Sequence, residues 1–291
     1  MSKIPYIHYQ KDQKSLIHTY FIALIPLLFF GFYKNGILLY QNDLITFQDI
    51  FIPLYFPLIS ILIGFLIGVI QKTSKKEMIL ISLILSCTVS MNTNILIYSL
   101  VLFAPLFITS IMSRKYAFNY ISLTRIVLIL ALIFNSYSYL NVAEKINAFN
   151  YNWSDKFLGY TNGGIFTSST FFVIISFLIL AFNKFYKRVI PITSSLSYVL
   201  ILALVFIITK DTTYLNNILN GTTYFAFVMF ATDPYTPNTK KGMMIYGVLI
   251  GIITSVLSLV IPMEASFISI FICSLTIPLI NKFLLKNVYN Q

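Results

Sequence analysis

Asp233 is the residue whose type and setting most directly suggest chemistry. It lies in the run Ala231-Thr232-Asp233-Pro234, and an Asp followed by Pro suits a helix start, where the carboxylate caps free N–H groups and proline takes the first helical position. The apolar stretch before it is too short to cross a membrane, so the carboxylate could lie at membrane depth, where an acid is a functional candidate by default. Two roles stay open: helix capping, and contact with a cofactor or with Na+ or H+.

Arg125, Gly247 and Gly251 also have two interpretations each. Arg125 lies in the first turn of an apolar segment, from which its guanidinium could reach the inner membrane surface or pair with a phosphate. The spacing of Gly247 and Gly251 either lets another helix approach closely or leaves backbone room for a flat ligand. The chain has no Gly-x-x-x-x-Gly-Lys-Ser/Thr, Gly-x-Ser-x-Gly or His-Glu-x-x-His motif, which argues against a self-contained ATPase or hydrolase.

Membrane helices must position these residues. The 291-residue chain is 58% hydrophobic and 10% charged with a mean hydropathy of +0.83, whereas about a quarter of the residues in soluble domains are charged. Its net charge of +11 comes from basic residues dispersed among short loops, and a nucleic-acid binder would gather them on one face. We therefore expect a lipid bilayer and no nucleic acid as partner. Cys87 and Cys273 lie in apolar runs and are expected to be packing residues.

Ten apolar segments are candidates for spanning helices, which need roughly 20 residues each. They are 16–33, 51–71, 77–90, 94–113, 121–140, 165–183, 189–209, 218–231, 242–261 and 264–281. The third and the eighth are short, and short segments at corresponding positions of two halves indicate inverted repeats. We predict one all-α membrane domain over 1–291, made of two inverted five-helix repeats at about 1–140 and 165–291.

The distribution of Lys and Arg predicts the orientation. With a cytoplasmic N-terminus and ten spans, fifteen of these residues fall in inner loops and only Lys34, Lys145, Lys156 and Lys210 fall outside. This is the bias of the positive-inside rule. We predict a multi-pass protein of the plasma membrane with both termini in the cytoplasm.

The outer side should carry one long polar loop, 141–164, which contains the only tryptophan, Trp153. Its aromatic residues form either an interfacial belt or a lid over a site. Asp49 and Glu264 lie near predicted outer helix ends, where we expect them to be solvated.

The sequence resembles the NqrB/RnfD family, whose members are membrane subunits of the sodium-pumping NADH:quinone oxidoreductase and of the Rnf ferredoxin:NAD oxidoreductase. The resemblance is clearest at Ala231-Thr232-Asp233-Pro234 with Gly242, Tyr246-Gly247 and Gly251 downstream. Weaker similarities occur in the family's order along the chain. They are Pro5-Tyr6-Ile7-His8, Ala23-Leu24-Ile25-Pro26, Asn119-Tyr120-Ile121-Ser122-Leu123, Gly163-Gly164-Ile165-Phe166-Thr167-Ser168-Ser169 and Pro278-Leu279-Ile280.

The resemblance implies a ten-helix subunit, similar in architecture to urea channels, that holds flavin and helps pass electrons across the membrane while a complex moves Na+ or H+. Its partners would be the other membrane subunits of an Rnf- or Nqr-like complex. The cofactor would be FMN or riboflavin. The residues implied in cofactor binding are Thr232, Asp233, Pro234, Gly247, Gly251, Arg125, Asn119, Gly163 and Thr167.

One departure from the family pattern bears on how flavin is held. The family attaches FMN to the threonine of a Ser-Gly-Ala-Thr motif, but the corresponding region, 145–153, has no threonine, and Thr167 stands where the family has Glu. We therefore expect noncovalent flavin, with Thr161 and Thr167 as remaining attachment points. The alternative functions are a transporter or channel of the same fold without redox activity, and a scaffold subunit that anchors partners.

Overall fold

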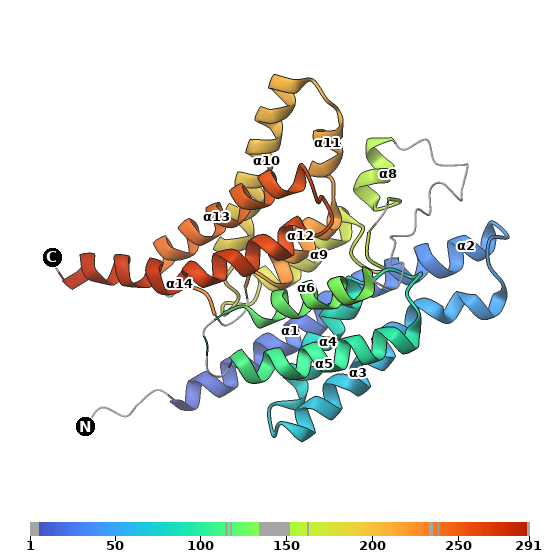
Figure 1. Ribbon diagram of the computed structural model, residues 1–291, viewed down its shortest axis with the longest axis horizontal. Helices are drawn as coiled ribbons and strands as arrows, with labels where there is room; N and C mark the ends of the chain where they lie inside the picture. Colours follow the sequence, from blue (N-terminus) through green and yellow to red (C-terminus); the bar gives the residue numbers. More distant parts are fainter. Residues whose placement is uncertain are drawn as a thin grey trace.

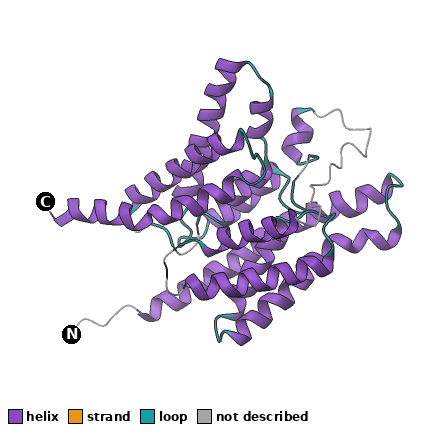
Figure 2. Ribbon diagram, viewed as in Figure 1, coloured by secondary structure: helices purple, strands orange, loops and turns teal. Residues whose placement is uncertain are grey.

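The computed structural model describes residues 6–113, 116, 118–133, 152–161, 163–232, 235–237 and 239–289, with side chains between Lys14 and Leu284. This part of the chain is helical and contains no strand (Figure 2). The helices are α1 (Tyr6–Phe32), the π-helix η1 (Tyr33–Ile37), α2 (Leu38–Gln41), the 3-10 helix η2 (Phe47–Phe51), α3 (Ile52–Ile70), α4 (Lys75–Cys87), α5 (Ile95–Ser113), α6 (Tyr120–Ile133), α8 (Trp153–Leu158), α9 (Thr170–Ala181), α10 (Val189–Thr209), α11 (Thr213–Ile218), α12 (Gly221–Met229), α13 (Lys240–Ser258) and α14 (Ala265–Tyr289).

Each of the ten predicted segments coincides with a helix, and an all-helical, multi-pass membrane fold is confirmed. In the described part, six helices are long and apolar enough to cross a membrane. The third and eighth segments form the short helices α4 and α12, which have 13 and 9 residues. The six-residue helices α8 and α11 were not predicted.

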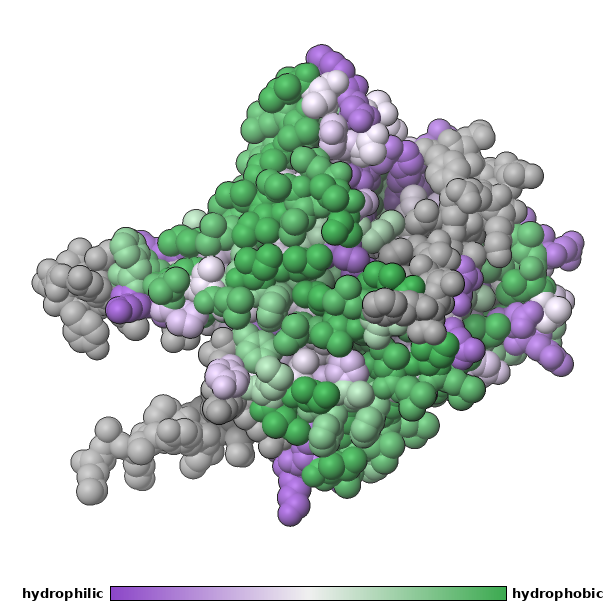
Figure 3. All heavy atoms as spheres, viewed as in Figure 1, coloured by the Kyte–Doolittle hydropathy of each residue, from purple (hydrophilic) through white to green (hydrophobic). Residues whose placement is uncertain are grey.

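The surface is the reverse of that of a soluble protein. Large apolar side chains such as Leu96, Leu100 and Phe182 point outward with exposed fractions of 74%, 73% and 90%. Figure 3 shows them as part of a broad apolar face. Serine and threonine are frequent among the buried residues. Because lipid cannot hydrogen-bond a polar group, such a protein turns its hydroxyl groups inward.

Helix pairs build the interior. In the N-terminal half α3 packs on α4 and α5 packs on α6, and in the C-terminal half α10 packs on α13, which packs on α14. The two halves meet where α1 contacts α9 and where α6 contacts α14. The start of α1 and the end of α14 lie on the same side of the molecule (Figure 1).

Two helix pairs match across the halves. Helices α5 and α13 each have 19 residues and begin 145 positions apart, at Ile95 and Lys240. Helices α6 and α14 also begin 145 positions apart, at Tyr120 and Ala265. A hydroxyl pair joins the helices of each half in the same way: Thr109 and Thr124 are 2.6 Å apart, and Thr254 and Ser269 are 2.8 Å apart.

A residue-level repeat accompanies this match. The end of α5 reads Ile-Thr-Ser-Ile-Met-Ser over 108–113, and the end of α13 reads Ile-Thr-Ser-Val-Leu-Ser over 253–258. In both, the last serine hydroxyl donates to the backbone carbonyl of the serine three residues earlier. This repeat was visible in the sequence, but a comparison of segment lengths overlooks it.

Candidate functional site

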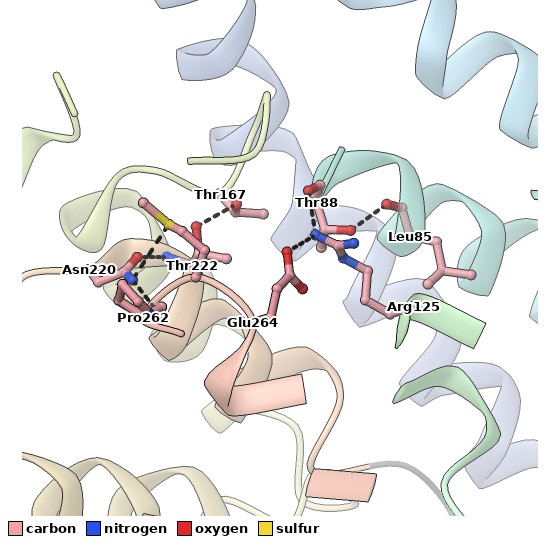
Figure 4. A network of polar contacts seen from close by, with 9 residues as sticks. Leu85, Thr88, Arg125, Thr167, Asn220, Thr222, Pro262 and Glu264 are labelled. Atoms are coloured by element: carbon pink, nitrogen blue, oxygen red, sulfur yellow. Dashed lines mark hydrogen bonds and ion pairs between the residues drawn. The ribbon is translucent and has the colours of Figure 1, made fainter. Parts of the chain in front are cut away.

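The candidate site begins at the C-terminal end of α4, which stops in the protein interior at Thr88. The last carbonyls of a helix have no partner within the helix, and in a membrane protein other groups of the protein must supply one. The Cys87 and Val89 carbonyls accept hydrogen bonds from the backbone N–H groups of Phe166 and Ile165, at 3.1 and 2.8 Å. The Thr88 carbonyl, between them, accepts one from Arg125 Nη2 at 3.1 Å (Figure 4).

Arg125 is held at this helix end by an ion pair. Its side chain is fully buried, and its Nη2 also lies 3.0 Å from Oε1 of Glu264, whose side chain is 14% exposed. The guanidinium lies 5.0 Å from the centroid of the Phe267 ring. A cation at a helix C-terminus is favourable because the carbonyl dipoles point their negative ends toward it.

These contacts correct two expectations. Arg125 does not extend to the inner surface, because α6 packs against α14 and turns this side chain inward. Glu264 is not solvated, since it immediately precedes α14 and points at Arg125, as Figure 4 shows. The guanidinium is thus engaged by a carboxylate, which argues against the phosphate interpretation of Arg125.

The segment 163–169 packs against α1, α4 and α12. A Cβ at Gly164 would lie 2.8 Å from the Cys87 carbonyl oxygen, so only glycine allows this approach to α4. The Thr167 hydroxyl lies 3.0 Å from that of Thr222 at the start of α12. Gly163, like Thr167 a predicted cofactor residue, is next to Ser168 and Thr222, to which a Cβ on it would come within 3.2 Å.

Lys34 joins this segment from the other side. It lies in η1, where we expected an exposed outer residue, yet it is only 2% exposed. Its ammonium donates to the Thr161 carbonyl at 2.7 Å and to the Ser168 hydroxyl at 2.8 Å. The neighbouring Asn35 amide donates to the Ile165 carbonyl at 2.7 Å. A π-helical turn within an α-helix often marks a functional position.

The end of α12 is built from neutral groups. The Phe230 carbonyl accepts from Asn119 Nδ2 at 2.6 Å, and Asn119 Oδ1 also caps α6 by accepting from the Ser122 N–H at 2.9 Å. The Val228 carbonyl accepts from the Tyr186 hydroxyl at 2.9 Å and from the Thr232 hydroxyl at 3.0 Å. Asn119 and Thr232, both predicted cofactor residues, are thus brought together at this second helix end.

Other predicted residues lie elsewhere. The nearest atoms to a Cβ at Gly247 or Gly251 are the Thr193 and Ser197 hydroxyl oxygens of α10, which agrees with the packing interpretation. Asp233 and Pro234 lie outside the described residues. So does most of the predicted outer loop, of which Trp153 opens α8 with its side chain 55% exposed.

Sequence reasoning missed three residues that the fold places in the site: Lys34, Thr222 and Glu264. Two of them carried a signal, because Lys34 interrupts an apolar run and Glu264 is an acid between two apolar segments. A charge so close to a membrane helix is a functional candidate even when a loop position could explain it. Thr222 had no such signal.

Two short helices that end in the interior of an all-helical protein, one of them at a buried ion pair, define a multi-pass membrane protein whose polar groups gather at helix ends. The family model described as the NQR2, RnfD, RnfE family matches residues 1–290, and the chain belongs to this family. These proteins are membrane subunits of multi-subunit Rnf- and Nqr-type complexes. No curated protein matches the chain.

Proposed function

We propose that the chain is a membrane subunit of a flavin-dependent electron-transport complex that couples electron transfer to movement of Na+ or H+. The observation that carries the proposal is the family match along 1–290. The bound flavin would supply the redox chemistry, and the protein would supply position and electrostatics. The partners would be the other membrane subunits of an Rnf- or Nqr-like complex in the plasma membrane.

The proposal includes one domain over 1–291 with ten spans in two inverted repeats. The 145-residue offset of α5 and α13, and of α6 and α14, supports it. Five helices per half reverse the topology of the second half, because five is odd. The shared side of the α1 start and the α14 end agrees with an even number of spans and two cytoplasmic termini (Figure 1).

The fit of a flavin can be judged from the segment 163–169. The Thr167 hydroxyl is fully buried and engaged with Thr222, so it is a poor attachment point for FMN. Hydroxyl and amide groups of Thr222, Ser168 and Asn35 surround the segment and are suited to hydrogen-bonding a noncovalent flavin. We propose that Gly163 and Thr167 belong to this binding region, and that Asp233 is the candidate contact for Na+ or H+.

Flavin content tests the proposal. The chain, purified in detergent alone and with its co-expressed neighbouring gene products, should show the visible spectrum of a flavin and release FMN or riboflavin on acid treatment. Colourless protein from both preparations would contradict the proposal. An Asp233→Asn variant that keeps its flavin should lose coupled ion movement in the complex, whereas the exposed Asp43→Asn should retain it.

A transporter or channel without redox activity is the second candidate, favoured by the missing attachment motif and by the engaged Thr167 hydroxyl. Proteoliposomes that contain only this chain distinguish the two. Solute or ion flux without an electron donor supports the transporter. Flux that requires an electron donor and the partner subunits supports the electron-transport subunit.

A further inference from the structure

Lys34 is a buried cation without a counter-charge among the described residues. Its side chain is only 2% exposed, and its hydrogen-bond acceptors are the neutral Thr161 carbonyl and Ser168 hydroxyl. In the described part of the chain, no carboxylate lies within the 4.0 Å ion-pair distance of it. Lysine is almost never fully buried unless it is paired, because removing a charge from water is expensive. The buried cation Arg125, by contrast, does have its carboxylate.

The surroundings of Lys34 add positive potential. Ser168 is followed by Ser169, whose hydroxyl caps the N-terminus of the 12-residue helix α9. The Ser168 carbonyl would lie 2.5 Å from a Cβ at Gly221, the first residue of the 9-residue helix α12. Two helix N-termini, each carrying a partial positive charge, thus lie beside the lysine.

The donors at this point suit an anion with several oxygens. An ammonium has three N–H groups, and that of Lys34 uses two hydrogen bonds within the described residues. The Thr167, Ser168 and Thr222 hydroxyls lie next to it in the same buried cluster. Helix N-termini with nearby hydroxyl groups are established binding sites for phosphate groups.

We propose that Lys34 is the counter-charge of a bound phosphate-type oxyanion held between the N-termini of α9 and α12. The anion is the phosphate group of FMN, an assignment that rests on the proposed function. A free phosphate or a lipid headgroup would use the same chemistry. The lysine would then tie α1 to the cofactor as well as to the segment 163–169.

Thermal unfolding and binding of the detergent-purified full chain test the proposal, with FMN, riboflavin and inorganic phosphate as separate probes. FMN should bind more tightly than riboflavin, and phosphate should compete with FMN. Lys34→Gln should weaken FMN binding by about tenfold or more, the loss of one charge-assisted hydrogen bond, and should leave riboflavin binding nearly unchanged. The matched control is Lys156→Gln, because Lys156 donates only to the exposed Asn216 amide oxygen.

The outcomes separate this inference from the proposed function. Equal binding of FMN and riboflavin, with phosphate inert, overturns the anion site and leaves the flavin function standing. Phosphate binding that depends on Lys34, without flavin binding, supports the anion site and contradicts the flavin function. If Lys34→Gln does not fold, Lys34→Arg keeps the charge, and retained preference for FMN in that variant supports the proposal. A native protein that ignores both phosphate and FMN refutes it regardless of any variant.

Discussion

The ends of α4 and α12 meet the same physical problem with different chemistry. Both helices stop in the interior and leave carbonyls that lipid cannot satisfy. At α4 the partner of the Thr88 carbonyl is Arg125, itself neutralised by Glu264. At α12 the partners are the Asn119 amide and the Tyr186 and Thr232 hydroxyls, all of them neutral in the described part of this end.

The difference teaches how each end should respond to change. A buried ion pair depends on both members, since loss of one leaves an uncompensated charge. A neutral cluster loses one hydrogen bond at a time, and each loss is smaller. We therefore expect the end of α4 to fail abruptly and the end of α12 to weaken in steps.

Glu264→Gln should have the largest effect. It leaves the fully buried Arg125 without its carboxylate and should lower the free energy of unfolding by about 3–5 kcal/mol. Unfolding in detergent measures it, with the exposed Asp43→Asn as control. Combining Arg125→Met with Glu264→Leu should recover much of the loss, because an apolar pair replaces the charges. An unfolding midpoint unchanged by Glu264→Gln would show that the pair does not support the end of α4.

Asn119→Ala should have an intermediate effect. It removes the cap of α6 and the partner of the buried Phe230 carbonyl together, which should lower the free energy of unfolding by about 2 kcal/mol. The same unfolding measurement applies, and Asn42→Ala, at an exposed asparagine after α2, should change little. A loss as large as that of Glu264→Gln would remove the contrast between the two helix ends.

Tyr186→Phe should have the smallest effect. It deletes one hydroxyl donor to the Val228 carbonyl, which keeps its second donor, Thr232. The expected loss is about 1 kcal/mol or less, against none for the exposed Tyr55→Phe. Because Thr232 shares this carbonyl, adding Thr232→Val should cause a larger loss than the sum of the two single changes. Strict additivity would mean that the two hydroxyls do not substitute for each other.

Much of the fold could be predicted because hydropathy and charge are local properties. The ten segments, the short α4 and α12 and the buried Cys87 and Cys273 follow from runs of residue types along the chain. The repeat at 108–113 and 253–258 was also readable, although segment lengths alone did not reveal it. The family resemblance, confirmed along 1–290, adds the order of motifs.

The sequence by itself determined which segments enter the membrane, since burial of apolar residues in lipid depends on composition over one helix length. Only the tertiary structure decided which polar groups face each other. Arg125 and Glu264 are 139 residues apart, and Lys34 and Ser168 are 134 residues apart. No local pattern specifies such pairs, because they follow from how whole helices pack. The same reason placed Lys34 in the interior, where an isolated loop would have left it in water.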